Sequence, residues 1–504
     1  MSENLNNPMR LGFIARFSRW AFSWRVARRA LITVAILATL IAAIYSFENW
    51  RGQRAWDKCR RDLIAAGYEM DWNKLIPPSI PDEQNIFKAP HMQEWLARFS
   101  SRAMQDTNSF PNKLKHSSAP YFGKDSRITN SIEAVAFLEW SKQFEAEFDL
   151  IRTALRRPYA RMEGNYSRPF EIPIPNFVTL RNLAQTLSQM AHCHLLLKQP
   201  DEAVADLRFV HDLRKSLLGK PSGKPMTLVS AMIHVAITGL YTTVVEEGLQ
   251  THAWQEKQLI EIESQLSEIT LAEPVREAFH CELAAVCHAF EQESFGKLMD
   301  MSVVVEGGRR EKGAIDRIGD GIKRQKLRIY DCAPRGWLQQ NLVVHAQLMR
   351  MINESLQGFG NDVSPRLIED AQQKLEGKLA ELSLFNLIAK IGIPNSRRAI
   401  QSTTRNQTTV HLSIIAIALE RHFLAHKQYP ETLDALVPQF IAKLPHDVIN
   451  GQPLKYRRTE TGGFILYSVG WNEKDDGGTV VMTSSKTPSV DMTKGDWVWA
   501  SEAK

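Results

Sequence analysis

The pattern of hydrophobic and polar positions divides the chain into three parts. Residues 30–47 form an apolar run that contains no charged side chain. From about Ser131 to Ile400, apolar residues recur at intervals of three and four, which is the spacing of amphipathic helices. In residues 406–504 a long apolar-faced helical pattern gives way to turn residues alternating with short apolar stretches, which is typical of strands. The pattern predicts a membrane helix, a mainly helical body and a small α+β domain.

The run ALITVAILATLIAAIYSF, Ala30–Phe47, has the properties of a single transmembrane helix. At about 1.5 Å per residue, its roughly 18 residues just cross the ~30 Å hydrocarbon core of a bilayer. The tryptophans that flank it, where the headgroup layer would lie, are Trp20, Trp24, Trp50 and Trp56. A secretory signal peptide has a similar apolar core, but its cleavage site needs small residues, and Ile44, Tyr45 and Phe47 stand there. We therefore expect an uncleaved anchor.

Basic residues on the two sides of the run leave its orientation balanced. They are Arg16, Arg19, Arg25, Arg28 and Arg29 before it and Arg51, Arg54, Lys58, Arg60 and Arg61 after it. Because the two clusters are equal, the positive-inside rule does not decide between them. The second cluster is diluted by Glu48, Asp57 and Asp62. We expect a cytoplasmic N-terminus, a single pass through the inner (cytoplasmic) membrane and a body outside the cytoplasm.

The segments around the membrane helix differ in character. Leu11–Val26 places arginines among Phe and Trp, which suits a helix lying on anionic lipid but also a disordered basic tail. Glu48–Gly67 continues the helical spacing, so we expect a helical stalk that ends at glycine. The prolines of Pro77–Asn85 predict a rigid, non-helical linker. Ser100–Ile128 is rich in Ser, Asn, Lys and Pro, which indicates a loop.

The clearest unit of the helical body is a hairpin around Gln199. Two amphipathic helices are joined by a short Pro-Asp turn, in which Asp201 is positioned to cap the second helix. The spacing of small residues resembles a tetratricopeptide-type hairpin. A period of about 34 residues does not recur, so a bundle or irregular α-array is favoured over a superhelical repeat array.

Composition excludes several classes of protein. With 44% hydrophobic and 23% charged residues, the chain can bury large cores and is not a disordered tail. Its net charge of +6 comes largely from arginines beside the membrane helix, so we expect no nucleic-acid partner. Five cysteines, an odd and sparse set, show neither a disulfide framework nor a CxxC metal motif. They are Cys59, Cys193, Cys281, Cys287 and Cys332.

Candidate catalytic chemistry is sparse. The consecutive residues 192–194, His-Cys-His, diverge by ~100° per residue on a helix and cannot close on one metal ion. In HCELAAVCHAF, residues 280–290, the His and Cys pairs are two turns apart, roughly 10 Å in rise and too far for one ion. The basic stretches 307–313 and 322–326 lack a phosphate-loop pattern. We therefore predict no catalytic and no cofactor-binding residue.

The C-terminal part carries a resemblance. His411–Ile441 predicts a long helix stopped at Tyr429-Pro430 and a short helix from Glu431, and Asn450-Gly451 precedes the expected strands Leu454–Arg458 and Phe464–Val469. The blocks ALER, YPETLDALVP, LPHD, GQPLKYR, YSVG and DDGG, in this order, are similar to the C-terminal globular domain of the type II secretion major pseudopilin. With the linker PPSIPDEQN, the whole layout resembles membrane-anchored proteins of planctomycete and verrucomicrobial type. These resemblances imply an architecture and no activity.

The pseudopilin resemblance also implies a calcium site. The positions that match the family are Asp447, Gly451, Pro453, Tyr456, Tyr467, Ser468 and Gly470. In the family, acidic residues in the next loop help bind calcium, and here these are Asp475 and Asp476. Val448 replaces the family's proline, and the N-terminal pilin cleavage signature is missing. Calcium takes six to eight oxygens, so carbonyls and water would complete the site; a solvated acidic turn is the alternative.

The predicted architecture is mainly α, with one N-terminal transmembrane helix, a helical bundle or irregular α-array, and a small pseudopilin-like α+β domain. Its parts are a basic amphipathic segment (1–29), the transmembrane helix (30–47), stalk, linker and loop (48–129), a helical domain (130–405) and the pseudopilin-like domain (406–504). We expect a non-catalytic envelope protein that contacts the lipid bilayer and binds envelope protein partners, near a secretion or pilus-like apparatus. The alternative is an envelope enzyme with a cleft between helical body and C-terminal domain.

Overall fold

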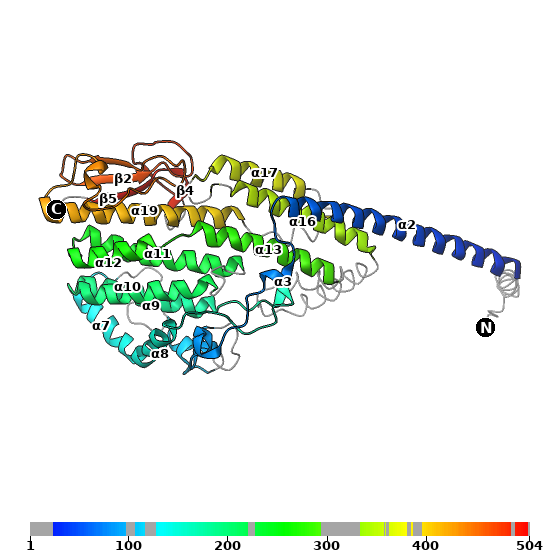
Figure 1. Ribbon diagram of the computed structural model, residues 1–504, viewed down its shortest axis with the longest axis horizontal. Coiled ribbons are helices and arrows are strands. Elements are labelled where there is room, and N and C mark those ends of the chain that lie inside the picture. The colour runs from blue at the N-terminus through cyan, green and yellow to red at the C-terminus, as the bar shows by residue number, and fades with distance from the viewer. Residues whose placement is uncertain are drawn as a thin grey trace, which may run out of the picture. The chain divides into compact units, whose positions relative to one another are not determined.

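The computed structural model describes residues 24–96, 106–115, 128–219, 227–293, 333–356, 358, 362–380, 385–386, 396–484 and 489–501 (Figure 1). This part of the chain is mainly helical with a small sheet near the C-terminus, which confirms the coarse fold class. One compact unit comprises Met1–Asp62, Phe290–Val344 and Ser383–Ile391, and the other comprises the rest. The basic stretches 307–313 and 322–326, residues 1–23 and Cys332 lie outside the described residues.

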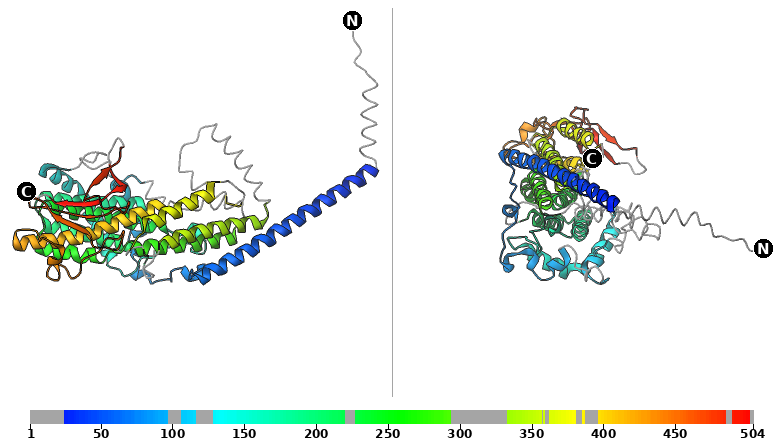
Figure 2. Two further views of the ribbon diagram at one scale, coloured as in Figure 1. Left: turned by 90° about the horizontal axis from the view of Figure 1, so that it is seen from above. Right: turned by 90° about the vertical axis from the view of Figure 1, so that its right-hand side faces the viewer.

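The predicted membrane segment is helical throughout. It belongs to α2, Trp24–Ala65, an uninterrupted helix of 42 residues (Figure 2). The predicted stalk is confirmed as well, because α2 continues through it. The amide of Tyr68 donates to the carbonyl of Leu63 at 3.1 Å, which closes the last turn. Gly67 follows with φ +89°, a left-handed conformation that glycine adopts without a steric penalty, so the helix ends where the sequence predicts.

The first unit joins the part of α2 after the apolar run to the start of α16 (Arg335–Ser355). Two glycines make this contact close, because a Cβ at Gly52 would meet the backbone of Gly336, and one at Gly336 would meet the backbone of Glu48. The amide of Gly336 donates to Asn49 Oδ1 at 2.9 Å. The start of α16 is therefore fixed at the level of Asn49.

The second unit holds most of the helices. Those described are α3 (Trp72–Leu75), η1 (Asp82–Gln84), η2 (Ile86–Lys88), α4 (Met92–Leu96), α6 (Phe110–Lys113), α7 (Ser131–Ser141), η4 (Lys142–Phe144), α8 (Glu145–Leu155), η5 (Pro169–Glu171), α9 (Phe177–Leu196), α10 (Pro200–Lys215), η6 (Ser216–Leu218), α11 (Leu228–Gln250), α12 (Glu256–Ser267), α17 (Pro365–Ala380), α19 (Ser396–His426) and most of α13 (Ala272–Gln292). Figure 1 shows α9, α10, α11 and α12 as neighbouring layers, with α19 beside α11 and α12.

The proline-rich segment is not a free linker. Asn85 is buried and its Nδ2 donates to the carbonyl of Arg161 at 2.6 Å, while the Arg161 amide donates to Asn85 Oδ1 at 3.0 Å. The amide of Ile86 donates to the carbonyl of Tyr159 at 2.7 Å. The prolines do keep the segment from forming an α-helix, as predicted, but its backbone is hydrogen-bonded into the second unit.

The predicted hairpin is formed by α9 and α10. Asp201 does not cap α10, however, because Pro200 occupies the first helical position and Gln199 the cap. Proline is favoured there because the first amide of a helix has no intrahelical partner. The carboxylate of Asp201 instead accepts a hydrogen bond from Gln258 Nε2 of α12 at 2.9 Å. The residue thus links two helices rather than ending one.

The core contains polar residues that sequence periodicity does not place there. In the first half of α19 the hydroxyls of Thr403 and Thr404 are buried and donate to the carbonyls of Ala399 and Ile400, both at 2.8 Å. Because each donor is satisfied within the helix, this polar stretch can pack in the core. For this reason α19 begins at Ser396, well before the helix predicted from His411. It also continues across residue 405, where the sequence predicts the end of the helical domain.

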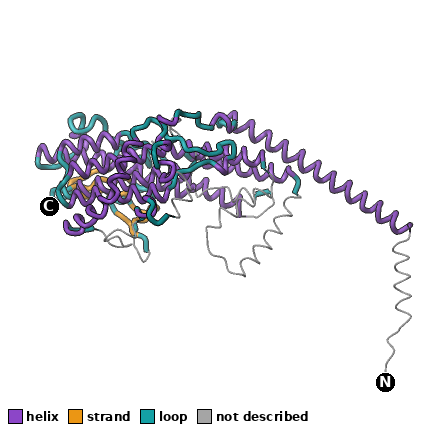
Figure 3. Tube along the Cα trace, turned by 90° about the horizontal axis from the view of Figure 1, so that it is seen from below, coloured by secondary structure: helices purple, strands orange, loops and turns teal. Residues whose placement is uncertain are grey.

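The two predicted C-terminal strands are observed as β1 and β2, and three further strands form after them. In Figure 3 they lie together in the C-terminal part of the chain. The strands are β1 (Lys455–Arg458), β2 (Phe464–Ser468), β3 (Val480–Met482), β4 (Val490–Gly495) and β5 (Trp497–Ser501). One antiparallel sheet has the order β1-β2-β5, with Tyr456 opposite Leu466, and β3 pairs with β4. The short helix expected from Glu431 is wrong, since only a 3-10 turn at Leu433–Leu436 forms.

Candidate functional site

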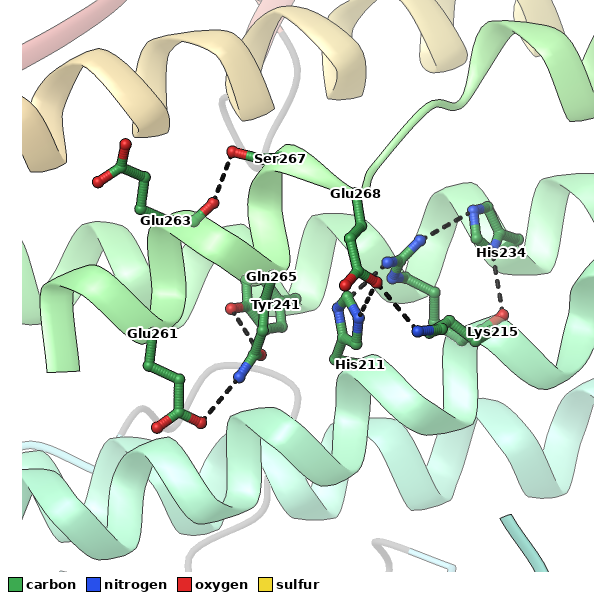
Figure 4. Close-up of polar contacts among 10 residues, drawn as sticks. His211, Lys215, His234, Tyr241, Glu261, Glu263, Gln265, Ser267 and Glu268 are labelled. Atoms are coloured by element: carbon green, nitrogen blue, oxygen red, sulfur yellow. Dashed lines mark hydrogen bonds and ion pairs between the residues drawn. The ribbon is translucent and has the colours of Figure 1, made fainter. Parts of the chain in front are cut away.

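A buried guanidinium lies between α10 and α11. Arg214 is 2% exposed. Figure 4 shows His211, Lys215, His234 and Glu268 close to one another. Arg214 Nη2 donates to His211 Nδ1 at 3.1 Å, and its Nη1 donates to His234 Nε2 at 3.3 Å. Its Nε has no hydrogen-bond partner in the described part of the chain. Two imidazoles, rather than carboxylates, therefore accept the hydrogen bonds of this cation.

The network assigns one tautomer to each imidazole. His211 Nε2 lies 3.2 Å from Glu268 Oε2 and donates to it, which leaves Nδ1 as the acceptor for Arg214. His234 Nδ1 donates to the backbone carbonyl of Arg214 at 3.0 Å, which leaves Nε2 as the acceptor. Each ring thus has one donor and one acceptor and is neutral. Burial, with the nearby Arg214 charge, lowers the pKa of His211 to about 4 and that of His234 to about 3.

The edge of the cluster is closed by α12. Glu268 accepts from Lys215 Nζ at 2.9 Å, and this hydrogen bond is the main reason that the pKa of its carboxyl is lowered. Tyr241 donates to Gln265 Oε1 at 3.0 Å, and Gln265 Nε2 donates to Glu261 at 3.1 Å. The polar groups are therefore used to join α10, α11 and α12. Both ring nitrogens of His211 and of His234 are bonded to protein groups.

A cavity of about 230 Å³ lies between α9 and α11. It is lined by Ile128, Gln185, Ser188, Gln189, His192, Leu240, Thr243, Val244 and Glu247. His192 Nδ1 is 2.7 Å from Glu247 Oε2, and its Nε2 is 2.9 Å from the carbonyl of Ile128. Both oxygens are acceptors, so both contacts are hydrogen bonds only when both ring nitrogens carry a proton. His192 therefore closes one side of the cavity and is not placed as a base.

Ser188 contributes a buried hydroxyl group to the wall of this cavity. Its side chain is 7% exposed, and its Oγ has no hydrogen-bond partner among the described residues. Buried hydroxyl groups are normally hydrogen-bonded, so a solvent molecule or a bound group is expected to complete this one. The Nε2 of His192, which would activate a serine nucleophile, is bonded to a carbonyl instead.

The consecutive residues His192, Cys193 and His194 point to different partners, as predicted from helical geometry. His192 is bonded to Glu247, whereas His194 Nδ1 lies 2.9 Å from Asp206 Oδ2 on α10. Cys193 is fully buried, and burial raises the pKa of its thiol to about 12, so the nucleophilic thiolate is strongly disfavoured.

The His and Cys pairs of α13 are used in packing. The ring centroid of His280 lies 5.2 Å from that of Tyr68, and that of His288 lies 6.3 Å from that of Trp72. Among the described residues, no group of three or more His, Cys, Asp or Glu is arranged to hold a metal ion.

The predicted calcium ligands lie in an internally bonded turn. Asp475 Oδ1 accepts from Tyr467 at 3.0 Å and from the amide of Gly477 at 3.1 Å, and the latter is the main reason its pKa is lowered. Asp476 Oδ2 accepts from Asn472 at 2.7 Å. The structure places both carboxylates in the loop that the resemblance indicates, each with a protein donor. Calcium binding there stays a prediction.

A buried carboxylate that sequence reasoning missed organises this loop. Asp496 is fully buried at the end of β4, and its oxygens accept the amides of Asp476, Gly478 and Thr479 at 3.2, 2.7 and 3.2 Å. In the sequence, Asp496 stands directly between Gly495 and the apolar segment Trp497–Ala500. Three backbone amides therefore donate to this buried carboxylate.

Two of the quoted sequence blocks meet in space. Asp447 is buried, and its Oδ1 accepts from Ser468 Oγ at 2.8 Å while its Oδ2 accepts from the amide of Val469 at 3.1 Å. The LPHD and YSVG blocks therefore form one structural contact.

A comparison with protein-family models, with curated proteins and with solved structures finds no match to this chain.

Proposed function

We propose that this chain is a single-pass membrane protein whose helical body is a non-catalytic scaffold that binds partner proteins. The observation that carries the proposal is the apolar part of α2. Its most hydrophobic window has a mean hydropathy of 2.3, and none of that window is buried. Side chains of this kind, exposed along a whole helix, favour a lipid environment over water.

The contrast with α11 supports this assignment. Among the described residues, α11 is the other helix that is long and apolar enough to cross a membrane, with a mean hydropathy of 1.7. Its window is 61% buried, and it contains His234, which is bonded to Arg214. Its apolar surface is thus covered by other helices, whereas that of α2 needs an external partner.

The anchor is tested by alkaline extraction of membranes from cells that express the full chain. The native protein should remain in the pellet. Leu37→Arg with Ile41→Arg should move it to the supernatant, because each charge at the centre of a membrane helix costs about 3 kcal/mol. Ile132→Arg, at an apolar side chain that is 79% exposed on α7, is the matched control and should remain in the pellet. Release of the native protein would contradict the anchor.

The orientation is proposed with the body outside the cytoplasm, at the inner (cytoplasmic) membrane. The support is the arginine cluster before the apolar run, which is free of nearby acidic residues. An alkaline phosphatase fused after Lys504 should be active, and a fluorescent protein that folds only in the cytoplasm should be dark there. The opposite pair of results would reverse the orientation.

Partner binding is proposed at the cavity between α9 and α11, with a component of a secretion or pilus-like apparatus as the partner. The side-chain amides of Gln185 and Gln189 in its wall are groups that can recognise peptide amides. A photoreactive residue at Gln185 should crosslink a membrane protein in native cells. The same residue at Ile260, which is exposed on α12, is the control. Equal crosslinking at the two sites would argue against a specific surface.

An envelope enzyme is the second candidate, and one observation favours it. The contact of 2.7 Å between His192 and Glu247 lies in the wall of a cavity, where a catalytic pair would be accessible. Catalysis would require His192 Nε2 to leave the Ile128 carbonyl. His192→Gln should abolish any hydrolytic activity found with the purified chain, and partner crosslinking that survives this change would favour the scaffold.

A further inference from the structure

A second cavity lies inside the first unit, directly beyond the membrane helix. Its volume is about 240 Å³, and α2, the end of α13 and the start of α16 line it. The wall residues are Gln53, Trp56, Asp57, Arg60, Phe290, Glu291, Arg335, Leu338, Gln339 and Leu342. Most of them are polar, so the cavity is suited to a polar ligand and not to an acyl chain.

The wall contains four charged side chains that form no ion pair within the described part of the chain. Arg335 Nη2 donates to the backbone carbonyl of Glu291 at 2.7 Å, and Trp56 Nε1 donates to Glu291 Oε1 at 2.9 Å. Asp57 Oδ1 accepts from Gln53 at 2.8 Å. These are hydrogen bonds to neutral groups. In the described part of the chain, no ion pair involves the four charged side chains of the wall, Asp57, Arg60, Glu291 and Arg335.

A wall with two cations and two anions, all lacking ion pairs, is complementary to a zwitterion. A ligand that carries a phosphate and a primary ammonium group can pair with both signs at once, and charge-assisted hydrogen bonds are the strong ones. A purely anionic phosphate would meet the carboxylates of Asp57 and Glu291 with repulsion. A quaternary ammonium group cannot donate hydrogen bonds to a carboxylate, so a choline headgroup fits less well.

The short distance along α2 between the apolar run and the cavity indicates the source of such a ligand. The Gly336 amide is bonded to Asn49, two residues after Phe47, so the start of α16 lies about 3 Å beyond the apolar run. Each headgroup layer is about 5 to 7 Å thick, so Arg335 would lie within it if α2 spans the bilayer as proposed. Glu291 is adjacent to Arg335, and the cavity extends away from the bilayer towards Arg60.

We propose that this cavity binds the phosphoethanolamine headgroup of a bilayer lipid, with the phosphate at Arg335 and the ammonium at Glu291. The inference rests on the proposed anchoring by α2. It adds a site with a defined ligand to that function: the headgroup fixes the junction of α2 and α16 at the membrane surface. Soluble phosphoethanolamine has the same chemistry and is the competing source.

The test uses the full chain in nanodiscs of phosphatidylcholine with equal small amounts of phosphatidylethanolamine and phosphatidylglycerol. Native mass spectrometry then counts the lipids that remain bound after detergent release. The native chain should retain phosphatidylethanolamine over phosphatidylglycerol by about tenfold, the effect of one charge-assisted hydrogen bond. Soluble phosphoethanolamine at millimolar concentration should not displace the lipid; displacement would assign the site to a soluble ligand and overturn the lipid assignment.

Two variants separate the roles of the charges. Glu291→Gln keeps an acceptor for Trp56 and should abolish the preference for ethanolamine over glycerol headgroups. Arg335→Gln should reduce the retention of both lipids by about tenfold. Lys58→Gln removes an exposed positive charge of α2 outside the cavity wall and is the matched control. Unchanged helical circular dichroism shows that each variant is folded.

Failure of this site is distinguishable from failure of the anchor. A native chain that stays embedded in the nanodiscs but shows no headgroup preference, or whose preference is unchanged in Glu291→Gln and Arg335→Gln, overturns the headgroup site alone. A native chain that washes off nanodiscs of every composition overturns the anchoring by α2, and with it the site.

Discussion

The buried histidines His211 and His234 should make the helical body sensitive to mild acid. Both are neutral in the folded chain because each accepts a hydrogen bond from Arg214. Their folded pKa values of about 4 and about 3 lie below the ordinary value of 6.5. The unfolded chain therefore binds more protons between these values, and stability must fall as pH falls from about 7 towards 4.

The size of the effect follows from the difference between folded and unfolded pKa. Between pH 7 and pH 5, an unfolded histidine takes up most of one proton, whereas the folded rings of His211 and His234 take up almost none. Integrating proton uptake at about 1.4 kcal/mol per pH unit gives about 2 kcal/mol for each histidine. The two rings together should reduce the free energy of unfolding by about 4 kcal/mol, a large fraction of the ~5–15 kcal/mol of a typical domain.

The double substitution His211→Gln with His234→Gln tests this acid sensitivity. Glutamine can accept from Arg214 and donate to Glu268 or to a carbonyl, as the imidazoles do, but does not titrate. Urea unfolding of the full chain in detergent, followed by circular dichroism at pH 5, 6 and 7, gives the free energies. The native chain should lose about 4 kcal/mol more than the variant between pH 7 and 5.

The control changes His426, an exposed histidine near the end of α19, to Gln and tests the chemical substitution itself. Its pH dependence should follow that of the native chain. If the double variant retains the native pH dependence to within about 1 kcal/mol, the two histidines are not neutral hydrogen-bond acceptors, and the network described for Arg214 is wrong.

Two further pairs of substitutions test helix packing and the burial of a carboxylate. Gly248→Ala places a Cβ against the indole of Trp254 and should destabilise the body by about 1–3 kcal/mol. Gly377→Ala has open space around its Cβ in α17 and should stabilise the body by about 0.5–1 kcal/mol. Thermal unfolding measures both effects. Asp496→Asn replaces one of the two carboxylate oxygens that accept from the amides of Asp476, Gly478 and Thr479. It should cost about 1–3 kcal/mol and expose the neighbouring loop to proteases, while Asp491→Asn, at a half-buried aspartate of β4, should leave proteolysis unchanged.

Sequence patterns predicted elements whose signals are local. The uncharged run gave α2, and Gly67 marked its end. The strands Lys455–Arg458 and Phe464–Ser468 form where alternation and turn residues indicated them. In each case the deciding interactions lie within a few residues along the chain, so periodicity and turn chemistry are sufficient.

Elements that depend on distant partners were missed or misplaced. The polar first half of α19 lacks an apolar face, and its Gln407 is buried because Oε1 accepts the amide of Leu271 at 2.8 Å. Asn85 looked like part of a linker because its partner, Arg161, lies far along the chain. Both errors have one cause: a polar residue is stable in the interior when a distant group satisfies it, and periodicity does not record that group.

The same reasoning explains why the Arg214 network was not foreseen and what it does for the fold. The i, i+3 spacing of His211 and Arg214 was visible, but His234 belongs to another helix. An α11 placed in lipid would leave His234 without its donor Arg214 and would bury a polar ring in hydrocarbon at a cost of several kcal/mol. The network therefore stabilises α11 as a helix of the body, although its hydropathy alone would allow it to cross a membrane. In α2 the most apolar window is not buried by other helices, so its hydropathy and its exposure are both consistent with the proposed membrane anchor.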